Sequence, residues 1–67
     1  MEPVLVTLKD DVTNVSRISQ DLQRSGLSVR DVFPNLGVIR GEADTAVHRA
    51  VRAHPGVLDV ERDYTGG

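Results

Sequence analysis

The sequence contains no cysteine and no tryptophan, and it has a single lysine among its 67 residues. The absence of cysteine excludes a disulfide framework and any thiolate metal site. No apolar run approaches the roughly 20 residues that a membrane-spanning helix needs. Eight basic and ten acidic residues are interspersed and give a net charge of −2, so no surface is suited to follow nucleic-acid phosphates. We therefore expect neither nucleic acid nor a membrane as partner.

The composition is that of a small globular protein, with 39% hydrophobic and 27% charged residues. A chain this short buries only about 60% of its unfolded surface and cannot divide its core in two. We expect a single domain over residues 1–67, in which residues 63–67 form a flexible tail. The start of the chain has no basic leader and only a short apolar run, which predicts a cytoplasmic protein.

The first part of the chain predicts a strand followed by a helix. Residues 4–9 (VLVTLK) alternate in polarity and are rich in β-branched side chains, as in a strand. Asp10 and Asp11 are candidate N-terminal caps of the helix. Gly26 supplies the left-handed residue that commonly ends a helix. The apolar stripe of this helix consists of residues three or four apart: Val12, Val15, Ile18 and Leu22.

Two strands follow. Residues 27–33 (LSVRDVF) form the first, and a break in their alternation indicates a bulge or turn near Asp31. The turn residues at 34–37 (PNLG) separate it from a short third strand at 38–41 (VIRG).

The last part of the chain predicts a second helix and a fourth strand. The helix is expected over residues 44–54 and is ended by Pro55 and Gly56. The strand is expected over residues 57–63. The apolar stripe of the helix consists of Ala43, Ala46, Val47, Ala50 and Val51.

This order of elements predicts an α+β fold, the ferredoxin-like βαββαβ two-layer sandwich. It has a four-stranded antiparallel sheet with both helices on one face. No further element of the sequence is left to cover the other face, so that face is either very polar or a docking surface. We expect Leu5 and Val32 to be its apolar contacts. On the fourth strand, Leu58 and Val60 are expected to point into the core.

The residues that carry most enzymatic chemistry are scarce or isolated. His48 and His54 are six positions apart without a neighbouring acid, which indicates surface histidines and no metal site. The serines have no adjacent histidine and acid for a nucleophilic triad. Lys9 is the one candidate nucleophile, for Schiff-base aldolase chemistry, but Asp10 and Asp11 favour its charged form. We expect no enzyme activity and no cofactor.

The end of the sequence carries a recognisable motif. Residues 57–63 (VLDVERD), entered from Pro55-Gly56, resemble the ending of the subtilisin propeptide family. Members of that family close with Gly-Val, two residues, and then Val-Glu-x-Asp. Residues 37–41 (GVIRG) are similar to the family's hairpin strand before its second helix. The similarity in layout covers residues 4–63.

The resemblance implies a function. In that family the small domain assists the folding of a subtilisin-like serine protease and inhibits it, and some members are stand-alone inhibitors. The open sheet face packs on two helices of the protease, the motif acids cap the N-termini of these helices, and the tail enters the substrate cleft. Family tails continue further and place a side chain in the specificity pocket, whereas a glycine fills no pocket. By this resemblance the capping acids would be Glu61 and Asp63, and the cleft residues would be Tyr64, Thr65, Gly66 and Gly67.

Other readings stay open at this point. Glu61 and Asp63 are also consistent with solubilising charge on an exposed strand. A second function is a ferredoxin-like regulatory or assembly module that forms a homodimer and binds a small ligand at the interface. The third is aldolase chemistry through Lys9.

Overall fold

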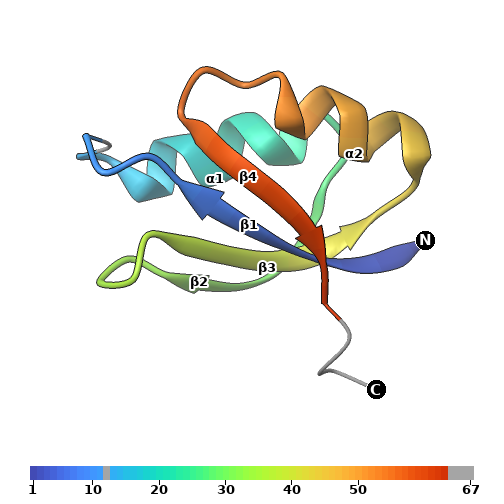
Figure 1. Cartoon of the computed structure of the whole chain (residues 1–67), viewed down its shortest axis with the longest axis horizontal. Coiled ribbons are helices and arrows are strands. Elements are labelled where there is room, and N and C mark those ends of the chain that lie inside the picture. Colours follow the sequence, from blue (N-terminus) through green and yellow to red (C-terminus); the bar gives the residue numbers. More distant parts are fainter. Residues whose placement is uncertain (12, 64–67) are drawn as a thin grey trace.

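The computed structural model describes residues 1–11 and 13–63, and in this part of the chain the expected element order is confirmed. The four strands form one antiparallel sheet in the order β2-β3-β1-β4. Both helices lie on the same face of this sheet (Figure 1), so the chain is an α+β ferredoxin-like sandwich. The elements are β1 (Glu2–Leu8), α1 (Val15–Arg24), β2 (Ser28–Phe33), β3 (Val38–Ala43), α2 (Thr45–Arg52) and β4 (Val57–Arg62).

The core lies between the helices and the sheet and is centred on β1. Val6 pairs with Ile39 of β3 on one side and with Val60 of β4 on the other, and all three side chains are fully or almost fully buried. Leu22 of α1 and Val51 of α2 belong to the same cluster and cover these side chains from the helical side of the sheet. The alternation at β1 is therefore explained by burial of one face of the strand, as expected.

Helix α1 begins later than the aspartates suggested. Its N-cap is Asn14, whose side-chain oxygen accepts the backbone N–H of Arg17 at 3.0 Å. Asp10 and Asp11 lie before it in a turn, so their expected capping role is wrong. The physical reason is position, because a cap must directly precede the first helical turn to reach its free amides. Val12, an expected member of the stripe, lies outside the described residues.

The C-terminus of α1 is closed by Gly26, as expected. Gly26 has a φ of 107°, and its N–H donates to the carbonyl of Gln23 at 3.0 Å. The N–H of Leu27 donates to the carbonyl of Leu22, also at 3.0 Å. This bond pattern is a Schellman motif, and the burial of both leucines supplies its usual apolar contact.

Helix α2 is shorter than expected and buries a narrower stripe. Its N-cap is Asp44, whose carboxylate accepts the N–H of Val47 at 2.8 Å. Val51 is buried and Val47 is half-buried, whereas Ala46 and Ala50 are exposed, so their assignment to the stripe is wrong. Val47 and Val51 lie four positions apart on successive turns of α2, and they pack against the core. The side chains of Ala46 and Ala50 are not part of this contact.

Both edge strands carry one extra residue relative to their partners. In β2 the register shifts between Val29 and Asp31, which confirms the expected irregularity and makes Arg30 the bulged residue. In β4 Leu8 pairs with Val57 and Thr7 with Asp59, so Leu58 is bulged.

The bulges reverse two orientations expected from the sequence, those of Leu58 and Val32. Leu58 is 64% exposed and Val57 is buried, so the expected inward position of Leu58 is wrong. Val32 packs against the core and does not contribute to the open face. Each bulge advances the chain by one residue and turns the following side chains to the other face.

Candidate protein-binding face

The face of the sheet opposite the helices is called the open face below. No element of the described chain covers it (Figure 1). It is defined by the side chains that alternate with the core positions in the strand register, together with Asp63 beyond β4. These residues are Pro3, Leu5 and Thr7 of β1, Ser28, Asp31 and Phe33 of β2, Val38, Arg40 and Glu42 of β3, and Asp59 and Glu61 of β4.

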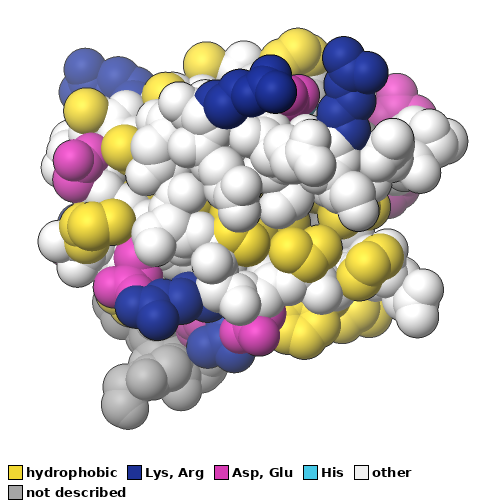
Figure 2. Space-filling model, turned by 180° about the vertical axis from the view of Figure 1, so that it is seen from behind, with side chains coloured by type: hydrophobic (Ala, Val, Ile, Leu, Met, Phe, Trp, Pro, Cys, Tyr) yellow, Lys and Arg dark blue, Asp and Glu magenta, His cyan; other side chains and the backbone are white. Residues whose placement is uncertain are grey.

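The two ends of the open face differ in chemistry. Phe33 and Val38 are directly paired next to the β2–β3 hairpin, where Leu36 is 72% exposed. At the other end Arg30 forms an ion pair with Glu42. Figure 2, seen from behind, shows hydrophobic side chains gathered over the hairpin and charged side chains over the opposite end of these strands. A partner would therefore meet an apolar contact at one end and charge at the other.

Arg40 organises the charged end. Its Nε lies 3.1 Å from Oδ2 of Asp63, and its Nη1 lies 3.7 Å from Oδ2 of Asp31. The Asp63 side chain is only 8% exposed, and its backbone N–H donates to the carbonyl of Pro3 at 2.9 Å. Asp63 is thus attached to the sheet through both its backbone and its side chain.

Glu61 has different surroundings from Asp63. It pairs with Leu5 across the strands, its side chain is exposed, and it makes no hydrogen bond or ion pair within residues 1–11 and 13–63. The two acids of the motif lie on the same side of the chain, two positions apart. One is available to a partner, and the other is engaged by Arg40. Tyr64, Thr65, Gly66 and Gly67 lie outside the described residues.

The open face carries more acidic than basic side chains, whereas the two helices carry more basic ones. The carboxylates of Asp31, Glu42, Asp59, Glu61 and Asp63 outnumber the guanidinium groups of Arg40 and of the bulged Arg30, which reaches the face at Glu42. Arg52 of α2 also lies 3.4 Å from Asp59 at the edge of the face. The helices carry Arg17, Arg24, Arg49 and Arg52, against Asp21. An acidic surface favours partners that present positive potential.

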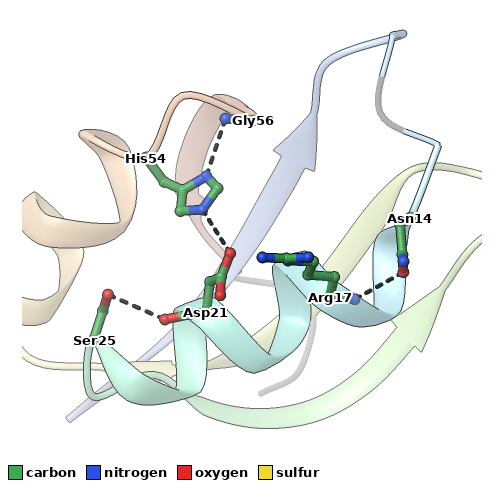
Figure 3. Close-up of polar contacts among 6 residues, drawn as sticks. All are labelled: Asn14, Arg17, Asp21, Ser25, His54 and Gly56. Atoms are coloured by element: carbon green, nitrogen blue, oxygen red, sulfur yellow. Dashed lines mark hydrogen bonds and ion pairs between the residues drawn. The ribbon is translucent and has the colours of Figure 1, made fainter.

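The histidines lie apart from this face. His54 Nδ1 accepts the backbone N–H of Gly56 at 3.0 Å, and its Nε2 lies 3.3 Å from Oδ2 of Asp21 (Figure 3). His54 is therefore a part-buried structural residue, and its expected place on the surface is wrong. The contact with Asp21 spans 33 positions of sequence, so no local pattern could have indicated it.

The described residues contain few other features of a chemical site. Lys9 is exposed at the end of β1, and it makes no ion pair with Asp10 or Asp11. No group of three or more metal-ligating side chains comes together within the described chain. No helix in the described ranges is both long enough and apolar enough to cross a lipid bilayer.

The comparisons with known proteins add no family. No protein-family model matches the chain, and a search of curated proteins finds no significant match. The resemblance to subtilisin propeptides therefore stays a prediction from the sequence motif.

Proposed function

We propose that this domain binds a subtilisin-like serine protease through its open face and its C-terminal segment, and that it inhibits the protease or assists its folding. The observation that carries the proposal is the exposed carboxylate of Glu61 on an uncovered acidic face, close to the end of β4. The motif 57–63 supplies the class of partner, because it resembles the ending of the subtilisin propeptide family.

The physical chemistry of Glu61 suits a helix N-terminus. The first turn of a helix offers backbone amides without intrahelical partners and a positive end of the dipole. A carboxylate that has no partner of its own in the described chain accepts such amides without first breaking an ion pair. Leu5, directly opposite Glu61, adds an apolar contact beside the charge.

The experiment is a titration of a subtilisin-type protease with the purified chain. Residual activity is followed with a peptide substrate, and mass spectrometry follows the integrity of residues 64–67. We expect inhibition with an intact C-terminal segment. Glu61→Gln removes the charge and should weaken inhibition roughly three- to tenfold, in line with helix-terminus energies of about 0.3–2 kcal/mol.

The matched control is Asp10→Asn. It makes the same change of charge in the loop after β1, away from the open face, and should leave the inhibition constant within about twofold. Absence of inhibition by the wild-type chain, or its rapid digestion, would contradict the proposal. Equal effects of the two substitutions would reduce the role of Glu61 to general electrostatics.

The homodimeric module remains the alternative function. A two-fold pairing of β4 strands centred on Val60 would bring Asp59 of one copy opposite Glu61 of the other, and like charges directly opposite are destabilising. Asp59 also lies 3.4 Å from Arg52 of its own chain, so this repulsion is partly compensated and weighs against this register of the dimer only. Sedimentation equilibrium detects the dimer, and titration of the protease above the dissociation constant of the dimer shows whether dimerisation blocks inhibition.

A further inference from the structure

We propose that Arg40 is a positioning residue that holds Asp63 against the sheet and thereby fixes the point from which residues 64–67 continue. This inference rests on the proposed function, in which that segment enters the cleft of a protease. It gives the two motif acids different tasks. Glu61 contacts the partner, and Asp63 attaches the end of the chain to its own domain.

The contacts around Arg40 hold Asp63 from two directions. The guanidinium of Arg40 lies 3.1 Å from the Asp63 carboxylate, and the Asp63 N–H donates to the Pro3 carbonyl at 2.9 Å. The side chain of Arg40 is itself oriented by Asp31 on the neighbouring strand, 3.7 Å away. The chain passes from β4 to the C-terminal segment at a residue attached to both β1 and β3.

The burial of Asp63 indicates that this contact is more than surface charge. Its side chain is 8% exposed, although it lies past the last residue of β4 at the end of the described chain. Residues near chain termini are ordered only where contacts tie them down. A carboxylate at this level of burial also requires a partner, and the Arg40 guanidinium supplies a charge-assisted hydrogen bond.

The consequence for binding follows from preorganisation. A segment whose first residue is fixed loses less conformational freedom when it is ordered against a partner. Arg40→Gln removes the charge but keeps much of the stem, and it should weaken inhibition roughly threefold to tenfold. The loss should arise through the C-terminal segment and not through a contact of Arg40 with the protease.

A double-mutant cycle tests this route. Tyr64→Ala removes the one large side chain of the segment, and the cycle combines it with Arg40→Gln. If Arg40 acts through the segment, its effect on the inhibition constant should shrink to less than about twofold in the Tyr64→Ala background. Additive effects, or no effect of Arg40→Gln in the wild-type chain, would overturn the inference. Arg24→Gln makes the same change of charge at the end of α1, on the helical side of the sheet and away from the open face; it is the matched control and should change inhibition by less than about twofold.

A second readout needs no protease. Hydrogen exchange of the Asp63 amide, measured by NMR, should become at least about fivefold faster in Arg40→Gln while core amides keep their protection. An unchanged Asp63 amide would overturn the proposed attachment. If the wild-type chain inhibits no subtilisin-type protease, the proposed function fails and the binding role of Arg40 fails with it, while the exchange rate still decides whether Arg40 fixes Asp63.

Discussion

His54 and Asp21 connect the segment after α2 to α1, with 3.3 Å between the imidazole Nε2 and the carboxylate Oδ2. The Gly56 N–H donates to Nδ1, so Nδ1 is the unprotonated nitrogen and Nε2–H donates to Asp21. Figure 3 shows this arrangement across the two segments. One imidazole thus satisfies a turn amide and joins two elements of the helical layer.

Removal of this imidazole should destabilise the domain. His54→Ala leaves the Gly56 amide without its acceptor and should lower the free energy of unfolding by about 1–2 kcal/mol, measured by urea denaturation. His48→Ala is the control, because the His48 side chain makes no hydrogen bond within the described residues, and it should cost less than about 0.5 kcal/mol. Equal losses in the two variants would show that the His54 contacts contribute nothing specific.

Gly41 should tolerate a side chain much less well than Gly37. A Cβ at Gly41 would lie 2.5 Å from the backbone oxygen of Ser28, so the β2–β3 pair would have to move. We expect Gly41→Ala to cost about 3 kcal/mol in thermal or urea unfolding. Gly37 has a φ of 64° and open space around it, so Gly37→Ala should cost only about 1 kcal/mol. A smaller cost at Gly41 than at Gly37 would contradict the close approach.

The cap of α2 gives a third prediction. Asp44→Ala removes the acceptor of the Val47 N–H and should lower the free energy of unfolding by about 1 kcal/mol. Asp44→Asn keeps a capping oxygen and should change stability by less than about 0.5 kcal/mol. Asp10→Ala serves as the comparison in α1, where Asn14 is the cap, and it should also be close to neutral. A large loss for Asp10→Ala would restore the aspartate as a cap.

The bulge in β4 predicts that truncation of Val57 destabilises the domain more than truncation of Leu58, which is the opposite of what the sequence suggests. Val57 is 5% exposed, so Val57→Ala should cost about 1–2.5 kcal/mol in urea unfolding. Leu58→Ala truncates a longer side chain, but one that is largely exposed, and should cost less than about 0.5 kcal/mol. The opposite order would place Leu58 in the core and contradict the register.

Substitutions of the two motif acids should differ in their effect on the stability of the domain as well as in their effect on binding. Asp63→Asn weakens the contact with Arg40 and should lower the free energy of unfolding by about 1 kcal/mol. Glu61→Gln removes a charge without a partner in the described chain and should leave the unfolding midpoint nearly unchanged. Circular dichroism during urea titration measures both, and equal midpoints for the two variants would contradict the difference in their surroundings.

The fold could be predicted from the sequence because its signals are local. The alternation at residues 4–8, the glycine at the end of α1 and the proline after α2 each fix one element or boundary. The irregularity in β2 was also visible, since two apolar residues of opposite parity stand on either side of Asp31.

The bulge at Leu58 and the contacts of Arg40 could not be predicted in the same way. Leu58 and Val60 are two positions apart, as two residues on the same face of a regular strand are. Only the packing of the folded domain shows that Val57 is buried in place of Leu58. Arg40 and Asp63 are 23 positions apart, and strand pairing through β1 brings them together. Asn14 did carry a local signal, because it directly precedes the apolar stripe of α1.

The extra residues in β2 and β4 both fall on the outer strands of the sheet. A second copy of the chain that paired with β2 or β4 would meet a bent strand, whose backbone N–H and C=O groups do not continue a regular ladder of hydrogen bonds. Extended stacking of sheets into fibrils requires such a ladder to run without interruption. The bulges at Arg30 and Leu58 therefore make both outer strands poor templates for such a ladder, although the broad face of this small, disulfide-free protein is uncovered in the described chain.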